Sequence, residues 1–292
     1  MTVVSDEPTG PPEVMRRKVR NIIRHERERR GITQKAAAER VLWSQSKLVR
    51  LETGVTPPAP ADVRLLLMEY GADEERVAEI VEIAKAARQP DEWETYKNAY
   101  SNVSINLFAN ERAATLIQKF EPTLVPGLFQ TEEYARALLR ETRSDPDKID
   151  DKVRARLHRQ EILDREDCPD IDFIIGEASV SRPIGGDSVM RAQIENLKKI
   201  AKHKKVALRL MPFSKGAHPG LGSAFTILEF KDPDLPDLVY LESADHESIV
   251  RDDQAEVDRY NRRFAELLDL ADPPEDLPAT LDEIAKQRFS SF

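Results

Sequence analysis

The segment "GITQKAAAERVLWSQSKLVRLETG", residues 31–54, decides how the first third of this 292-residue chain is interpreted. Thr33 is suited to cap a short helix, and the alanines that follow it let another helix approach closely. Ser44 begins a second helix, in which Leu48 and Leu51 face inward. A glycine ends that helix just before the breaker run "VTPPAP". Two short helices joined by a tight turn predict a helix-turn-helix unit.

This segment lies in the most basic part of an acidic protein. The chain carries a formal net charge of -9, whereas residues 13–52 hold 12 Lys and Arg against 5 Asp and Glu, a local charge of +7. A local basic excess is the electrostatic footprint of phosphate-backbone binding, and it is also typical of a solvated helix face. The charge alone leaves both interpretations open.

The stretch "TQKAAAERVLWSQSKLVRLETG" resembles the helix-turn-helix of the xenobiotic-response-element-type (XRE) family of transcriptional regulators. The resemblance rests on the Thr-Gln start, the small Ala38, the Ser-Gln-Ser opening and the Glu-Thr-Gly close. It implies a lambda-repressor-like, all-α domain of five helices that binds double-stranded operator DNA through the helix beginning at Ser44. One position departs from the family, because Leu42 stands where a turn glycine is usual. This departure predicts a longer turn or a different end of the preceding helix.

Side-chain chemistry assigns the predicted DNA contacts. Gln, Lys and Arg donate hydrogen bonds to base edges in the major groove, which predicts base contacts from Gln45, Lys47 and Arg50. Short hydroxyls and exposed helix N-termini favour anions, which predicts phosphate contacts from Thr33, Gln34, Ser44 and Ser46. A purely capping role for Ser44 is an equal alternative. Trp43 is expected to pack in the turn without touching DNA.

Two further amphipathic helices complete the predicted first domain. "APADVRLLLMEYG" and "ADEERVAEIVEIAKAARQ" each place apolar residues on one face, which extends the helix-turn-helix domain over residues 10–90. A bundle of this size folds readily but encloses no pocket of its own. Residues 91–292 are therefore expected to form a second domain for sensing a ligand or a partner and for dimerisation.

The second region mixes strands with helices. The short runs "IDFIIG", "KVALRLMPF", "SAFTILEF" and "DLVYLES" are rich in Val, Ile, Leu and Phe and predict strands, and they flank the helix "SVMRAQIENLKKIAKHKK". We expect a mixed α+β domain with a small, largely antiparallel sheet of about four or five strands. The fold class predicted for the whole chain is α+β.

Three separated stretches of this region carry a second resemblance. "FEPTLVPGLFQTEEYARALL", "RPIGGDSVMRAQIENL" and "MPFSKGAHPGLGSAFTILEF" resemble a C-terminal domain of unknown function that follows this kind of helix-turn-helix in many actinobacterial regulators. The resemblance implies a regulator of development or antibiotic production that often acts with a small partner protein encoded nearby. It supplies no ligand, so a small-molecule effector and a partner protein are both candidates.

The loop "SKGAHPGLGS" raises the question of catalysis. A flexible loop carrying Lys215 and His218 could supply a general base, oriented by Glu229 or Glu242 on neighbouring strands. The sequence lacks a paired nucleophile, a metal-ligand spacing and a phosphate loop of the Gly-x-x-x-x-Gly-Lys type. We therefore expect no enzyme activity, no cofactor and no metal, and a loop that covers a pocket or an interface.

The stretch "RPIGGDSVMRAQ" is a second candidate ligand site. Backbone amides after its two glycines, together with Arg182, could hold a phosphate or a carboxylate. Capping of the helix by Asp187 or Ser188 is the favoured alternative, since an aspartate there would repel an anion.

Other features of the sequence limit the compartment, the oligomeric state and the class of function. A lone Cys168 excludes an internal disulfide, and neither an apolar signal core nor a membrane-spanning run is visible, so we expect a cytoplasmic protein without a membrane partner. A homodimer is expected, because operators offer two half-sites to two short recognition helices. The competing hypothesis is a protein-interaction module whose acidic C-terminal domain binds a small partner protein, with DNA binding secondary.

Overall fold

The computed structural model describes residues 10–142, 145–242 and 248–289, which divide into two compact units. The first unit runs to Glu94 and includes Asp232–Leu235, and the second comprises Thr95–Lys231 and the chain from Pro236 onward. In the described part of the chain, no helix is both long and apolar enough to cross a membrane.

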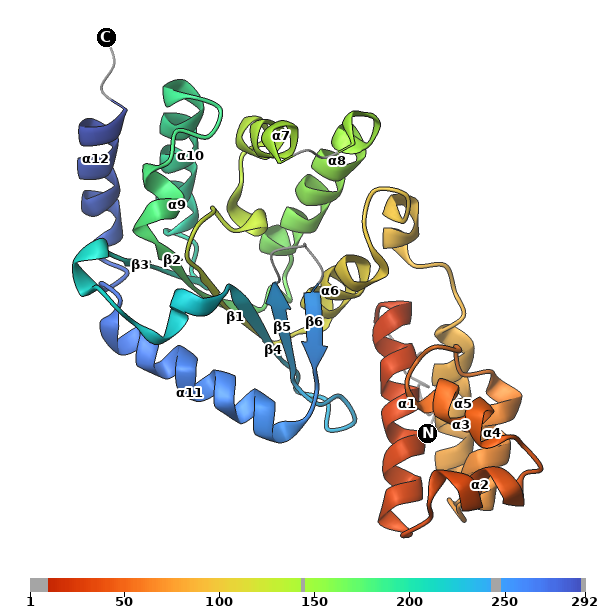
Figure 1. Ribbon diagram of the computed structural model, residues 1–292. Coiled ribbons are helices and arrows are strands. Elements are labelled where there is room, and N and C mark those ends of the chain that lie inside the picture. The colour runs from red at the N-terminus through yellow and green to blue at the C-terminus, as the bar shows by residue number, and fades with distance from the viewer. Residues whose placement is uncertain (1–9, 143–144, 243–247, 290–292) are drawn as a thin grey trace, which may run out of the picture. The chain divides into compact units, whose positions relative to one another are not determined.

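The first unit is built from five helices (Figure 1). They are α1 (Pro12–Arg29), α2 (Gln34–Arg40), α3 (Gln45–Glu52), α4 (Pro60–Glu69) and α5 (Glu74–Ala86). All five contribute side chains to a single apolar core, among them Val19, Ile23, Ala37, Leu48, Leu66 and Ile80. The small Ala37 and Ala38 are fully buried, which lets α2 lie close against its neighbours. The predicted five-helix arrangement is confirmed.

Helices α1, α2 and α4 end in the same hydrogen-bonded turn. In α1, the Gly31 N–H donates to the Glu28 carbonyl over 2.8 Å, and the Ile32 N–H donates to the Arg27 carbonyl over 3.1 Å. This pair of bonds defines the Schellman motif, which requires a left-handed residue just after the helix. Glycine fills that position after α1 and after α4.

After α2 the left-handed position is filled by Leu42, whose φ is 56°. The Leu42 N–H donates to the Glu39 carbonyl over 3.1 Å, and the Trp43 N–H donates to the Ala38 carbonyl over 2.8 Å. The turn is therefore neither lengthened nor changed in type, and the adjustment predicted from the missing glycine is wrong. The left-handed conformation strains any residue with a Cβ atom. The Leu42 side chain is 94% exposed, so it buries no apolar surface that would offset this strain.

We expect Leu42→Gly to stabilise the first unit. A left-handed L-residue costs about 1–2 kcal/mol, and the greater freedom of glycine in the unfolded chain removes about 0.5–1 kcal/mol of that gain. The net increase in the free energy of unfolding should be about 0.5–1 kcal/mol. Urea unfolding followed by tryptophan fluorescence reports on this unit, because Trp43 and Trp93 are the two tryptophans of the chain and both lie in it.

Leu42→Ala is the matched control, since it removes the exposed side chain and keeps the strained backbone. An equal gain from Leu42→Ala would contradict the strain argument.

The second unit contains a six-stranded mixed sheet. Its strands are β1 (Leu116–Glu121), β2 (Asp170–Gly176), β3 (Val206–Met211), β4 (Phe225–Glu229), β5 (Leu238–Glu242) and β6 (Ser248–Arg251), in the order β3-β2-β1-β4-β5-β6. The pairs β1/β2 and β2/β3 are parallel, and the other three are antiparallel. The four runs recognised in the sequence form β2 to β5, whereas β1 and β6 raise the strand number above the predicted four or five.

Helices cover both faces of this sheet (Figure 1). They are α6 (Asn102–Ala113), α7 (Glu132–Glu141), α8 (Ile149–Gln160), α9 (Glu177–Ser181), α10 (Asp187–Ile200), α11 (Gln254–Leu270) and α12 (Leu277–Arg288). Helix α11 buries Tyr260 and Phe264 against Phe225 of β4, while α7 to α10, which connect the parallel strands, lie over the opposite face. This burial on both faces explains the continuous apolar runs of the central strands.

The three parallel strands run in the same direction, so their carboxyl ends and the connections that follow them lie along one side of the sheet. The loop after β3 is held to this side, because the Phe213 N–H donates to the Glu177 carboxylate over 2.8 Å. The same loop meets the sheet at Gly220, where a Cβ atom would lie 2.3 Å from the Phe120 ring. Only glycine permits this approach, so the loop bearing Lys215 and His218 is anchored on the core.

Candidate nucleic-acid interface

Helix α3 has one buried and one exposed side. Leu48 and Leu51 are buried, whereas Gln45, Ser46, Lys47 and Arg50 are exposed. Ser44 precedes the helix as its N-cap, and its hydroxyl accepts the Lys47 N–H over 3.3 Å. The capping role considered for Ser44 is confirmed. The first turns of α3 therefore present polar side chains outward from a rigidly packed helix.

These exposed side chains differ in their partners. Gln45 and Arg50 make no side-chain hydrogen bond or ion pair with any residue that the structure describes. Lys47 is held on two sides, because its Nζ lies 3.2 Å from Asp62 Oδ1 and 3.5 Å from the centre of the Trp43 ring. Trp43 packs against the apolar core, as expected for a turn residue. Gln45 and Arg50 are the side chains most available to a ligand.

The start of α2 is organised by its own side chains. The Thr33 hydroxyl is exposed and accepts the Ala36 N–H over 3.2 Å as the N-cap of α2. The Gln34 amide donates to Glu52 Oε2 over 2.8 Å. Thr33 and Gln34, two of the four residues predicted to contact phosphate, thus have structural roles, and Thr33 is exposed at the surface.

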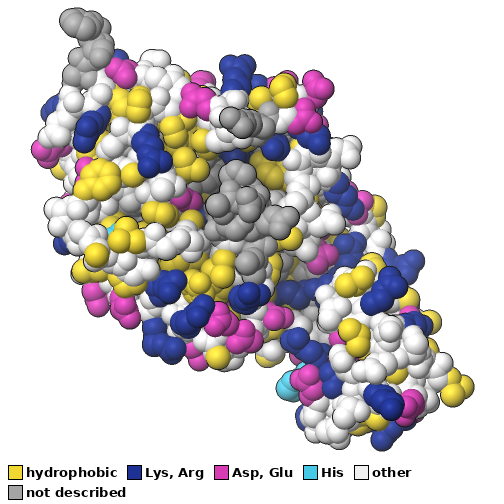
Figure 2. Space-filling model, viewed as in Figure 1, with side chains coloured by type: hydrophobic (Ala, Val, Ile, Leu, Met, Phe, Trp, Pro, Cys, Tyr) yellow, Lys and Arg dark blue, Asp and Glu magenta, His cyan; other side chains and the backbone are white. Residues whose placement is uncertain are grey.

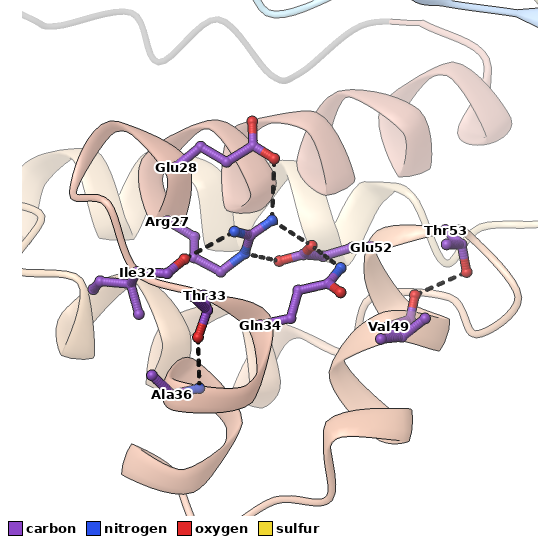
Figure 3. Close-up of polar contacts among 9 residues, drawn as sticks. All are labelled: Arg27, Glu28, Ile32, Thr33, Gln34, Ala36, Val49, Glu52 and Thr53. Atoms are coloured by element: carbon purple, nitrogen blue, oxygen red, sulfur yellow. Dashed lines mark hydrogen bonds and ion pairs between the residues drawn. The ribbon is translucent and has the colours of Figure 1, made fainter.

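A buried ion pair connects the three helices around this surface (Figure 3). Arg27 of α1 donates to both carboxylate oxygens of Glu52 in α3, over 2.7 Å from Nε and 2.9 Å from Nη2. Arg27 also donates to the Ile32 carbonyl over 2.9 Å, and Gln34 of α2 completes the network. The Glu52 side chain is 1% exposed. The network fixes α1, α2 and α3 relative to one another.

Arg27 is not among the residues predicted from the sequence, although its position carries a signal. Val19, Ile23 and Arg27 follow one another at intervals of four residues, which places the arginine on the buried stripe of α1. Glu52 follows Leu48 at the same interval on α3. Opposite charges on two apolar stripes predict a buried pair once the helices are known to pack together.

Burial and charge also shift the acidity of neighbouring groups. The hydrogen bonds accepted by Glu52 raise the pKa of Arg27. Burial, reinforced by the Glu52 charge, raises the pKa of Tyr70 to about 12. The buried Tyr70 hydroxyl has no hydrogen-bond partner among the described residues. Arg27 therefore stays charged and Tyr70 stays neutral across the physiological range.

The basic excess of residues 13–52 is partly neutralised inside the unit. Lys47 pairs with Asp62 over 3.2 Å, and Arg40 pairs with Glu69 over 3.8 Å, and both carboxylates lie in α4, outside the counted range. Figure 2 shows Lys and Arg side chains interspersed with Asp and Glu on the visible face. The surface attraction for a polyanion is thus weaker than the count of charges suggests.

Two of the three weak candidates of the second unit, Lys215 and His218, lie in the loop after β3, whereas Arg182 follows the short helix α9. Arg182 ends α9 and is exposed, and Lys215 is exposed in the loop after β3. The His218 Nδ1 accepts the Gly220 N–H over 3.2 Å, and its ring meets Phe120 edge-on at 5.5 Å. Burial lowers the pKa of His218. Within the described ranges, no hydrogen bond or ion pair joins these three residues to one another.

The pairing considered for His218 and Glu229 does not occur. His218 lies against Phe120, which pairs with Phe225 at the start of β4, whereas Glu229 pairs with Leu116 at the opposite edge of the sheet. The Glu242 side chain lies outside the described part of the structure. Across the described residues, no cluster of three or more His, Cys, Asp or Glu could hold a metal ion.

The capping predicted at "RPIGGDSVMRAQ" is wrong. The N-cap of α10 is Gly186, with a φ of 86°, and no side chain caps the helix. Asp187 is the first helical residue and Ser188 the second. Because Gly186 takes the N-cap position, Asp187 and Ser188 lie inside the helix, one and two residues past the position from which a side chain caps.

Comparison with protein families adds independent evidence. A family described as "Domain of unknown function (DUF5753)" matches residues 105–283, which is more than half of the chain. The chain belongs to the DUF5753 family. A family described as "Helix-turn-helix domain" matches residues 22–80, a range that contains α2, α3 and α4. Both resemblances drawn from the sequence are confirmed, and the helix-turn-helix match supports a DNA-binding regulator. No curated protein and no solved structure matches this DUF5753 protein.

We expect Glu52→Gln to destabilise the first unit of this DUF5753 protein. The substitution removes the buried counter-ion of Arg27 and leaves only the exposed Glu28 carboxylate, 3.1 Å from Nη2. Breaking a buried pair costs about 3–5 kcal/mol. Urea unfolding followed by tryptophan fluorescence measures the loss. Glu39→Gln, an exposed glutamate of α2, is the matched control and should change the free energy of unfolding by less than about 0.5 kcal/mol.

Arg27→Met combined with Glu52→Leu should recover most of the lost stability, because apolar replacements leave no unpaired charge. A double variant as unstable as Glu52→Gln would contradict the assignment of the loss to an unpaired charge.

Proposed function

We propose that this DUF5753 protein is a sequence-specific transcriptional regulator that places α3 in the major groove of operator DNA. The observation that carries the proposal is the division of α3, which buries Leu48 and Leu51 while it presents Gln45, Ser46 and Arg50 to solvent. A major groove about 12 Å wide admits one α-helix, and side chains on its first turns reach base edges.

Each exposed side chain matches a partner in DNA. The Arg50 guanidinium fits the two acceptors of guanine, and the Gln45 amide fits the donor and acceptor of adenine. Ser46 and Thr33, both exposed beside helix N-termini, suit phosphate oxygens. The Arg27 network supports this division of labour, because it orients α3 through α1 and α2 without using the exposed side chains.

We further propose that the protein acts as a homodimer in the cytoplasm. Helix α3 has eight residues and reads only a few base pairs, so specificity requires two half-sites about 34 Å apart. In a two-fold symmetric dimer, each copy presents one such helix to one half-site, and the two helices are equivalently oriented.

The second unit is proposed to sense an effector. Lys215 and His218 lie on the loop that follows β3, and Arg182 follows α9 in the connection between β2 and β3. Ligands of open sheets bind beyond the carboxyl ends of parallel strands. Binding there would act by changing the spacing of the two recognition helices. A binding role is favoured over an enzymatic one, because His218 and Glu229 lie at opposite edges of the sheet. The regulated process is proposed to be development or secondary metabolism.

One observation favours a partner protein as the effector. Phe213 is 58% exposed and Leu221 is 64% exposed on the same loop as Lys215 and His218. Large apolar side chains on an anchored surface loop are typical of protein contacts, whereas small molecules are held in concave sites.

We expect Arg50→Ala to weaken binding to the preferred DNA by about 1–3 kcal/mol and to relax the preference at one base pair. The measurement is fluorescence anisotropy with fragments from the gene's own neighbourhood, across a salt series and with unrelated DNA as competitor. Arg88→Ala is the matched control, because it removes an equal exposed charge just beyond the far end of α5.

An equal loss in both variants would show that Arg50 contributes only charge. Binding that never favours any fragment, at any salt concentration, would contradict the proposed function itself.

A further inference from the structure

Lys47 differs from the exposed Gln45 and Arg50 of α3, because its side chain is paired within the protein. Its Nζ lies 3.2 Å from Asp62 Oδ1 of α4 and 3.5 Å above the centre of the Trp43 ring. Arg50, one turn further along the helix, has no such partner among the described residues. The lysine charge nearest the N-terminus of the recognition helix is therefore locally neutralised.

Asp62 is well placed to hold this lysine. It stands in the first turn of α4, where the helix dipole stabilises a carboxylate. The two side chains are partly exposed, at 44% for Lys47 and 30% for Asp62. An ion pair in such a position is weak enough for a phosphate to displace the carboxylate. Breaking the pair still costs some free energy, which reduces the binding free energy that the phosphate contact contributes.

We infer that Asp62 limits the affinity of the protein for DNA. Its carboxylate pairs with the Lys47 ammonium, which would otherwise contact a DNA phosphate. The inference rests on the proposed function, and it assigns to Lys47 a contact with the phosphate backbone in place of the base contact predicted from the sequence. Trp43 contributes because the Lys47 ammonium lies over the face of its ring, which holds the charge beside the carboxylate.

The consequence concerns DNA of unrelated sequence. Non-specific affinity grows with the number of phosphates that a protein neutralises, because each contact releases counterions. A lysine already paired with a carboxylate releases fewer of them. Asp62 thus lowers the affinity for random DNA, while Gln45 and Arg50, which it does not contact, continue to read the sequence.

The test measures binding of the full-length protein to a random-sequence duplex between 50 and 200 mM salt. Asp62→Asn should bind more tightly than the wild type at 50 mM, and this advantage should shrink by about threefold at 200 mM, as expected for one added phosphate contact. The rank order of preferred fragments should stay unchanged. Glu75→Gln, at an exposed glutamate in the first turn of α5, removes the same charge from a residue that has no lysine partner in the described structure, and it should have a smaller effect.

A double-mutant cycle identifies the route of the effect. In a Lys47→Met background, Asp62→Asn should no longer change the affinity for random DNA, because Asp62 acts through Lys47. A gain that persists in that background, an equal gain from Glu75→Gln, or a loss of affinity in Asp62→Asn would each overturn the inference.

The same measurements distinguish a failure of this inference from a failure of the proposed function. A wild type that prefers one fragment, together with an unchanged Asp62→Asn variant, removes the inference alone. A wild type and variants that bind no DNA remove both.

Discussion

The ion pair between Arg27 and Glu52 is the interaction on which the geometry of the first unit depends. It is almost fully buried, it joins α1 to α3, and through Gln34 it also holds the start of α2. Apolar contacts tolerate small rotations of a helix, whereas a bidentate arginine-carboxylate pair has a narrow range of allowed geometry. The outward direction of Arg50 is therefore set by a contact that Glu52 makes two residues later, on the opposite side of α3.

The turn between α2 and α3 adds a second constraint. A complete Schellman motif ends α2, and the buried alanines and the Trp43 ring keep the two helices together. Leu42 adopts the conformation of a glycine because the surrounding hydrogen bonds and packing determine the backbone more strongly than its own preference. A strained residue at this point shows that the helix-turn-helix geometry is enforced by tertiary contacts.

The second unit depends on a sheet that is covered by helices on both faces. Its core strands are buried by α11 on one face and by the crossover helices on the other, so their sequences read as continuous apolar runs. The polar and exposed groups are left to the loops at the edge of the sheet, where Gly220 and Glu177 anchor the segment that carries His218. A rigid sheet with an anchored loop is a suitable support for recognition.

The sequence by itself determined the α+β class, the five helices, the exposed and buried sides of α3 and four of the six strands. These features follow from local periodicity and capping, which neighbouring residues decide. Only the tertiary structure decided the pairing of Arg27 with Glu52, the parallel pairing around β1, the engagement of Lys47 by Asp62 and the separation of His218 from Glu229. Each of these joins residues far apart in the chain, and such contacts depend on how the elements pack, which no local pattern records.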